Sequence, residues 1–419
     1  MELQLLRGGK FKMIRPEILA PAGNLDKLKI AIDFGADAVY LGGSKLNLRA
    51  FADNFTNEKL KEGVEYAHER NRKVYVTMNV FPHNEDLSGV EEYLKELYEI
   101  GIDAIIASDA AIISAAREVV PELEIHLSTQ ANNVNWRAAK FWYDQGVKRI
   151  VMARELTLVE IKEMRDNLPQ ECEIEAFVHG AMCISYSGRC LISNYMVGRD
   201  ANRGACAQPC RYKYHLVEEK RPGELYEVVE DDNGTYIMNS KDLCMIEHID
   251  DVINAGVYSL KIEGRMKSLY YVAAVVKSYK QAVDAYMKDP ENYKFDPKWM
   301  ENLNNVSHRQ YHTGFYYGQN NEQVYEDSGY IRNADIVGIV REYDEETKIA
   351  TIEHKNKVLN GDTVEVLRPE GDNFEIVLHD MTEENGTPIE KAARAQMMYK
   401  VKVDVPLMPK DLLIKNKHL

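Results

Sequence analysis

The sequence has few features of a secreted or membrane-bound protein. Its 419 residues contain no run of 18 apolar residues, so no transmembrane helix is expected. The first residues, MELQLLRGGKFKMIRPEIL, hold no apolar stretch followed by a cleavage site of small residues, and no signal peptide is expected. Cysteine is scarce, with six in all. These absences predict a cytoplasmic protein with reduced thiols and argue against a disulfide-bonded framework.

Motifs of several enzyme classes are also missing. The chain contains no HExxH, no GxSxG and no GxxxxGK[ST], so the common zinc proteases, α/β-hydrolases and P-loop nucleotidases are excluded. Hydrophobic residues make up 45% and charged residues 28% of the chain, which is ordinary for a globular protein with a sizeable core.

Basic residues are too few for a protein coated in nucleic acid. There are 52 Lys and Arg against 67 Asp and Glu, a net charge of −15. Residues 183–221 run against this balance, with seven basic and three acidic residues. These charges are either solvated surface groups or a local basic groove, and the sequence leaves both open. The seven are Arg189, Arg199, Arg203, Arg211, Lys213, Lys220 and Arg221.

A βα repeat runs through the first two thirds of the chain. Gly35, Gly101, Gly146 and Gly256 each follow an amphipathic stretch and precede a short apolar run. Glycine suits the left-handed end of a helix, and the apolar run predicts a buried parallel strand. Eight such strands predict a (β/α)₈ barrel rather than an open sheet. The expected strands are 17–20, 37–42, 73–80, 103–107, 124–129, 148–152, 171–178 and 257–263.

The repeat stops after the eighth strand, which divides the chain into parts. Residues 1–288 are expected to form the barrel domain, and residues 289–330 a linker with some helix. Residues 331–419 alternate apolar and polar side chains between turn signals such as LNGD (359–362). That pattern predicts a small all-β barrel domain at the end of the chain.

The active site of such a barrel lies at the carboxyl ends of its strands. Any single polar residue there can equally be a turn residue without a catalytic role. In the same way, His179 can be a structural histidine, and Arg154 and Glu155 can form a structural pair. The candidate catalytic residues are Arg154, Glu155, His179, Lys261, Glu263 and Arg265; Asn79 and Gln130 are expected at the same rim.

Four of the six cysteines lie within 28 residues, in the long connection between strands seven and eight. They are Cys183, Cys190, Cys206 and Cys210; Cys244 follows, and Cys172 is expected to be buried. Clustered thiols in a reduced protein indicate a metal site or redox chemistry. The two close C-x₂-C pairs typical of structural zinc are absent, as is the short ferredoxin spacing. Placement at the barrel rim favours an iron–sulfur cluster, with zinc and free or catalytic thiols as alternatives.

The residues assembled so far resemble one family. The segment EAFVHGAMCISYSGRCLIS (175–193) is similar to the signature of the collagenase-like peptidases, peptidase family U-32. NRGACAQPCR (202–211), NSKDLC (239–244), SLKIEGRMKS (259–268), LAPAGN (19–24) and DAVYLGG (37–43) extend the resemblance over nearly the whole chain. Other branches of the family resemble oxygen-independent hydroxylases of transfer RNA, ribosomal RNA or a quinone precursor.

The resemblance implies a cofactor and partners. It implies a [4Fe-4S] cluster on Cys183, Cys190, Cys206 and Cys244, leaving Cys210 as the non-ligand. The domain arrangement is most similar to a branch that hydroxylates C5 of the wobble uridine of transfer RNA with prephenate as a required metabolite. In that case Arg154, Lys261 and Arg265 would clamp a dicarboxylate, and Arg199, Arg203 and Arg211 would meet RNA phosphates.

Two other functions stay open at this stage. The family name implies a peptidase, although the sequence offers no recognisable protease machinery. A non-catalytic protein that binds RNA or the ribosome through its β domain is the third possibility.

Overall fold

The structure is a computed structural model. It describes residues 14–48, 54–183, 185–211, 215–217, 225–227, 241–318, 331–394 and 396–417; of residues 211, 215–217 and 225–227 it describes only the backbone.

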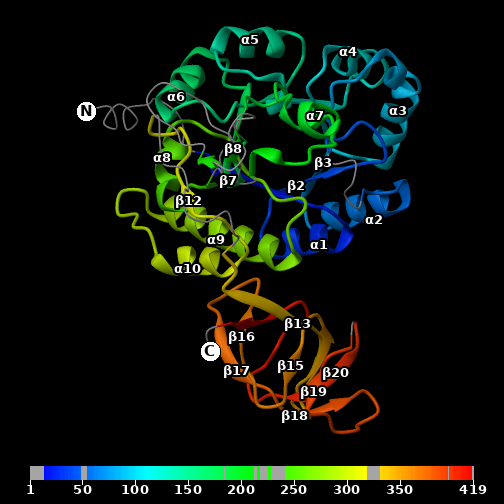
Figure 1. Ribbon diagram of the computed structural model, residues 1–419, viewed down its shortest axis with the longest axis vertical. Coiled ribbons are helices and arrows are strands. Elements are labelled where there is room, and N and C mark those ends of the chain that lie inside the picture. Colours follow the sequence, from blue (N-terminus) through cyan, green and yellow to red (C-terminus); the bar gives the residue numbers. More distant parts are fainter. Residues whose placement is uncertain are drawn as a thin grey trace.

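Eight parallel strands within these residues close a barrel (Figure 1). The last strand pairs in parallel with both the seventh and the first, which removes every free edge. The predicted (β/α)₈ fold is confirmed: each strand begins within two residues and ends within three residues of its expected position. The strands are β1 (Glu17–Pro21), β2 (Ala38–Gly42), β3 (Lys73–Met78), β4 (Ala104–Ala107), β5 (Glu124–Leu127), β6 (Arg149–Val151), β7 (Glu173–Ala181) and β11 (Ser259–Ile262).

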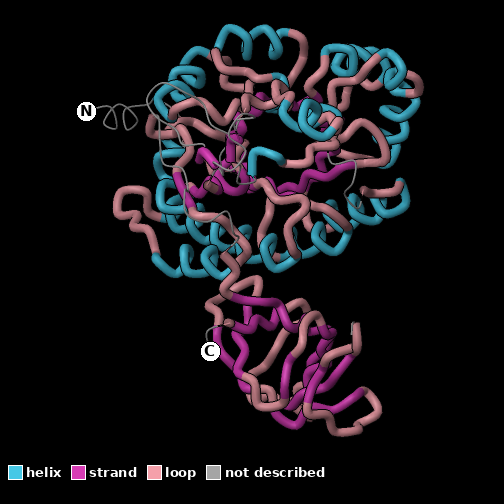
Figure 2. Tube along the Cα trace, in the orientation of Figure 1, coloured by secondary structure: helices cyan, strands magenta, loops and turns pink. Residues whose placement is uncertain are grey.

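Helices cover the outside of the barrel, as Figure 2 shows. Their starts follow from polar caps: Thr157 and Glu160, for example, form a capping box. Gly101 ends a helix at φ 91°, the left-handed conformation expected of it. No helix in the described ranges is both long and apolar enough to cross a membrane. The outer helices are α1 (Leu25–Asp33), α2 (Asn57–His68), α3 (Val90–Ile100), α4 (Ala110–Val119), α5 (Trp136–Asp144), α6 (Leu158–Asn167), α8 (Ile249–Asn254) and α9 (Leu269–Lys288).

The predicted insertion between β7 and β11 lies over the barrel mouth, where Figure 1 shows α7 (Ile192–Val197). Phe81, just after β3, donates its backbone N–H to the carbonyl of Asn202 at 3.3 Å. The insertion returns through β10 (Asp242–Cys244), which pairs antiparallel with the end of β7 and parallel with β12 (Tyr311–His312). Its other elements are η4 (Ala201–Arg203), η5 (Pro209–Arg211), β8 (His215–Val217) and β9 (Leu225–Glu227).

The C-terminal strands form a separate antiparallel sheet, curled into a half-barrel below the first domain in Figure 2. In β14 every second residue is buried, the period that predicted these strands. The order is β17 (Phe374–Val377), β16 (Thr363–Leu367), β21 (Leu412–Asn416), β13 (Ala334–Asp344), β14 (Ile349–His354), β20 (Met398–Lys402) and β18 (His379–Glu383). β15 (Val358–Leu359) pairs with β19 (Lys391–Ala392). The helix α10 (Pro297–Asn305) lies between the domains. The remaining short turns of the barrel domain are η2 (Asn84–Leu87), η3 (Thr129–Ala131) and η6 (Ile246–His248).

Candidate functional site

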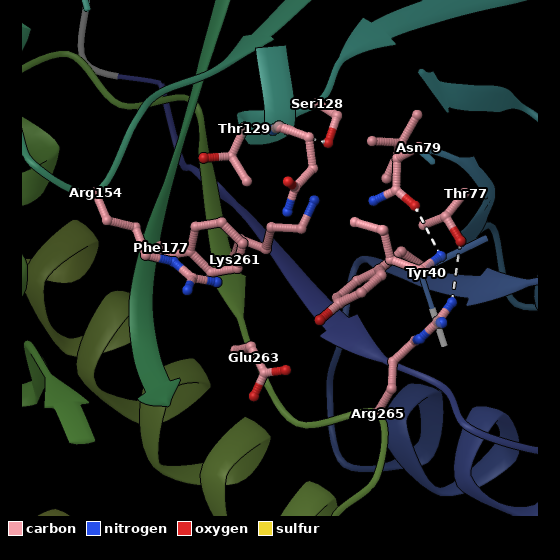
Figure 3. A pocket seen from close by; sticks show the side chains of 13 residues that line it. Tyr40, Thr77, Asn79, Ser128, Thr129, Arg154, Phe177, Lys261, Glu263 and Arg265 are labelled. Carbon is pink, nitrogen blue, oxygen red and sulfur yellow. Dashed lines mark hydrogen bonds between the residues drawn. The ribbon is translucent and has the colours of Figure 1, made fainter. Parts of the chain in front are cut away.

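A cavity opens at the carboxyl ends of the barrel strands, where the fold predicts a site (Figure 3). Its volume is about 540 Å³, including the part open to solvent. Six of the rim residues expected from the sequence line this cavity together. Its lining consists of Tyr40, Leu48, Thr77, Asn79, Ile106, Ser128, Thr129, Gln130, Arg154, Phe177, Lys261, Glu263 and Arg265.

Arg265 is held in place by two neighbouring side chains. Its Nη1 donates to Thr77 Oγ1 at 3.0 Å, and its Nη2 donates to Asn47 Oδ1 at 3.0 Å. Gly42 makes this close approach possible, because a Cβ there would lie 2.7 Å from Arg265 Nη1. The guanidinium is therefore oriented before a ligand arrives, which reduces the entropy lost on binding.

Lys261 lies at the floor of the cavity and is paired with a buried carboxylate. Its Nζ donates to Glu175 Oε1 at 2.6 Å, and both residues are buried. Burial lowers the pKa of Lys261, an effect that the neighbouring Glu175 partly offsets. Burial alone would raise the pKa of Glu175, but Lys261 and Arg149 hold it below its ordinary value. The pair is thus a charged floor for the cavity.

Below this pair, the barrel interior is filled by further buried charges. Arg149 Nη1 lies 3.1 Å from Glu175 Oε2 and 2.6 Å from Glu17 Oε1. Arg149 also contacts Glu173 at 2.8 Å, and the Tyr75 hydroxyl donates to Glu17 Oε2 at 2.7 Å. A buried charge is tolerable only when paired and hydrogen-bonded, so this network fixes the position of Glu175 and through it Lys261.

Arg154 lies on the other side of the cavity from Arg265 in Figure 3. Its Nη1 donates to the carbonyl of Ala181 at 3.2 Å, and its guanidinium carbon lies 3.9 Å from the centre of the Phe177 ring. Its Nε is buried and makes no hydrogen bond within the described residues. An unsatisfied donor beside a cavity is a position that an anionic ligand can satisfy.

The cavity lining carries three cationic side chains and one carboxylate. Arg154, Lys261 and Arg265 are the cations, and Glu263 is the carboxylate. Guanidinium groups bind carboxylates through paired hydrogen bonds, and two of them on opposite sides suit a ligand with two acidic groups. No histidine or cysteine is in the lining described above, so a nucleophile–histidine pair is not available there.

The structure places Glu155 and His179 away from this cavity, since neither is in its lining. Burial raises the pKa of Glu155. His179 packs among Tyr271, Tyr279 and Tyr311, on α9 and β12, with ring centres 5.4 to 5.8 Å apart. Its Nδ1 lies 3.4 Å from the Tyr279 hydroxyl, and burial lowers its pKa to about 3. The lowered pKa keeps His179 neutral, and its Nε2 is buried and makes no hydrogen bond among the described residues.

The clustered cysteines are spread over two settings. Cys183 and Cys206 are exposed and Cys190 is half-buried, all on the segment over the barrel mouth. Cys244 is buried in β10, 3.9 Å from the Tyr279 hydroxyl, and burial raises its thiol pKa to about 12. Among the described residues no three His, Cys, Asp or Glu side chains are close enough to share a metal ion. The cluster that the resemblance implies on Cys183, Cys190, Cys206 and Cys244 therefore stays a prediction.

The arginines expected to meet RNA lie on the same covering segment. Arg199 Nε donates to the carbonyl of Ala205 at 2.9 Å. Arg203 forms an ion pair with Asp86 at 2.9 Å, after β3, and so ties the segment to the rim. The side chain of Arg211 lies outside the described part of the chain.

Among the site residues that were not anticipated from the sequence, three hold cationic side chains of the cavity in place. Thr77 and Asn47 position Arg265, and Glu175 positions Lys261. A signal for Glu175 exists: Glu173 and Glu175 recur at period two in an otherwise apolar strand, which places both on the barrel interior. Asn47 lies in a loop and carries no comparable signal.

Comparison with known proteins identifies close relatives. The profile of peptidase family U32 matches residues 23–326, and that of the peptidase family U32 C-terminal domain matches residues 332–413. The chain is 43% identical to tRNA hydroxylation protein P1 of Bacillus subtilis (strain 168), over 99% of this chain and 98% of that protein. It is 40% identical to tRNA hydroxylation protein P of Escherichia coli (strain K12), over 89% and 90%. It is also 37% identical to a collagenase of Porphyromonas gingivalis (strain ATCC BAA-308 / W83), over 72% of this chain and 74% of that protein.

Proposed function

Since the chain belongs to peptidase family U32 in both of its domains, we propose that it is an enzyme that hydroxylates transfer RNA. The observation that carries this proposal is the similarity, over 99% of the chain, to a relative named for that activity. We propose C5 of the wobble uridine as the modified atom and the cytoplasm as the place of action. A base in a folded RNA has to leave its stack to reach a cavity inside a barrel, and an anticodon loop offers such a base.

The cationic cavity supports an anionic co-substrate, and we propose prephenate, a dicarboxylate. Arg265, oriented by Thr77 and Asn47, would bind one carboxylate. Arg154, with its buried unsatisfied Nε, would bind the other. Lys261 would add a positive charge at the floor while Glu175 holds it in position. Glu263 is the acidic group of the lining and is the candidate for moving a proton at the cavity.

We also propose a [4Fe-4S] cluster on Cys183, Cys190, Cys206 and Cys244. Hydroxylation without molecular oxygen needs electron transfer, which such a cluster supplies when bound. Three of these thiols are accessible on one segment above the cavity, but Cys244 is buried and the four are not gathered. These four cysteines are the residues that would hold the cluster, and no reaction step is assigned to it.

A peptidase is the second candidate, on the strength of the relative named collagenase. The cavity argues against it, because its lining contains neither a histidine nor a cysteine to activate or act as a nucleophile. Ser128 is the hydroxyl closest to such a role, yet it accepts a hydrogen bond from the Gln130 backbone at 3.3 Å and caps a turn. Gelatin left intact by the purified protein would remove this candidate.

Nucleoside mass spectrometry of transfer RNA tests the proposed function. Transfer RNA is isolated from cells with the gene, without it, and with the gene restored. Loss of 5-hydroxyuridine and its derivatives in the deletion strain, and its return on restoration, is the expected result. Unchanged nucleoside content in the deletion strain would instead favour a non-catalytic RNA-binding protein.

A further inference from the structure

The segment over the barrel mouth exposes large apolar side chains. On α7 and the residue before it, Tyr195 is 92% exposed, Leu191 68% and Val197 53%. Met196 in the same helix is 42% exposed. Single exposed apolar residues are common, but neighbouring ones on one short helix mark an interaction surface. We call Leu191, Tyr195, Met196 and Val197 the α7 patch.

The sequence around the α7 patch is rich in arginine, in a chain that is otherwise acidic. Residues 183–211 contain four arginines and a single acid, Asp200, whereas the whole chain has a net charge of −15. Arg199 lies two residues after the end of the helix, beyond Gly198. A partner of this surface is therefore expected to be anionic and to offer flat apolar faces.

The α7 patch is tied to the rim of the cavity. Gly188, just before the helix, approaches the carbonyl of Gln130 so closely that a Cβ would lie 2.6 Å away. Gln130 itself lines the cavity. After the helix, Arg203 pairs with Asp86 and the Asn202 carbonyl accepts from Phe81. The segment that carries the patch is thus anchored on both sides of α7 to residues at the rim of the cavity.

We propose that the α7 patch is a stacking platform for unpaired bases of an RNA, with Tyr195 as the principal stacking residue. This inference rests on the proposed function and adds the place where the RNA loop binds. Exposed aromatic rings flanked by arginines bind single strands because every base has a flat face and every nucleotide a phosphate. A second copy of the chain fits less well, because a symmetric contact would bring the same arginines together.

Tyr195→Ala tests the platform. Binding is measured by fluorescence anisotropy on the purified full chain, with labelled single-stranded oligouridine, duplex RNA and a transfer RNA transcript. We expect Tyr195→Ala to weaken binding of oligouridine and transfer RNA by about tenfold or more, and duplex RNA hardly at all. Tyr195→Phe keeps the flat ring and should bind like the parent. Tyr98→Ala is the matched control, since Tyr98 on α3 is 44% exposed and far from this segment in sequence.

Two outcomes would overturn the inference. One is unchanged RNA affinity for Tyr195→Ala when that variant folds like the parent. The other is a change in oligomeric state, seen by light scattering, which would make the patch a protein interface. Failure of the proposed function is separate: the deletion strain would then keep its hydroxyuridine, while Tyr195-dependent RNA binding by the purified protein could still be present.

Discussion

Glu175 is the residue on which the charged interior of the barrel depends. Its two carboxylate oxygens accept from Lys261 at 2.6 Å and from Arg149 at 3.1 Å. We expect Glu175→Gln to lower the free energy of unfolding by about 3–5 kcal/mol, because two buried cations lose their counter-charge. Urea denaturation measures this change. Asp144→Asn, in an exposed pair with Lys140, is the control and should change it by less than about 1 kcal/mol.

Glu175 also makes the free energy of unfolding depend on pH in the acidic range. The pKa of Glu175 is lowered in the folded protein from the ordinary 4.5, so its contribution is complete above that value. It is lost as the pH falls through the folded-state pKa, where the carboxylate takes up a proton. Glu175→Gln should therefore flatten the acid side of the stability profile. A profile that keeps the parent's slope below pH 4.5 would show that other carboxylates dominate.

At the scale of elements, the cysteine segment and β10 have to cooperate if a cluster forms. We expect alanine in place of Cys183, Cys190, Cys206 or Cys244 to abolish the iron content and visible absorbance of protein purified without air. Cys210→Ala should retain both, and is the matched control from the same segment. Iron and acid-labile sulfide analysis provides the measurement. A colourless parent protein that contains stoichiometric zinc would contradict the proposed iron–sulfur cluster.

The strands were predictable from sequence because their burial alternates or is continuous over short runs bounded by glycine, as at Gly101. The direction in which individual side chains point was harder to predict. Phe177 faces the cavity, and period two would place His179 beside it. The register between β7 and β11 shifts between Lys261 and Ile262, and Ile262 pairs with His179. Such a bulge re-aims the following side chain, and here His179 packs against α9 instead.

Contacts between loops that are distant in the sequence could not be predicted either, because they depend on how the folded chain brings the loops together. Asn47 and Arg265 are 218 positions apart, and their hydrogen bond depends on how two loops meet at the rim. Arg154, Lys261 and Arg265 were named as candidates because they lie in or just after the carboxyl-terminal parts of predicted strands. Asn47 follows no such rule, so only the assembled barrel reveals it as the residue that positions Arg265.

For the whole molecule, a polar link joins the two domains. Lys277 of α9 donates to Asn373 Oδ1 at 2.7 Å, and Asn373 Nδ2 donates to Glu365 at 2.6 Å and to Asn302 of α10 at 3.0 Å. Leu412 from the C-terminal sheet belongs to the same apolar core as the barrel helices. The domains are therefore expected to unfold together.

Asn373→Ala tests this coupling. It leaves Lys277, which is 1% exposed, without its amide partner, and should lower stability by about 1–3 kcal/mol. Differential scanning calorimetry should show one transition for the parent, shifted downward in the variant. Glu370→Ala, an exposed residue of the same loop, should leave the transition in place. Two separate transitions in the parent would mean that the domains are independent.

Hydroxylation of transfer RNA at the cationic cavity is the function that we propose for this protein. Its most direct test is the 5-hydroxyuridine content of transfer RNA, by mass spectrometry, in a deletion strain carrying either the parent gene or Arg265→Lys. Lysine keeps the charge but cannot reach Thr77 and Asn47 together as the guanidinium does. We predict full restoration by the parent and a loss of about tenfold or more with Arg265→Lys, at equal protein levels. Hydroxyuridine that is unaffected by the deletion, or fully restored by Arg265→Lys, would contradict the account.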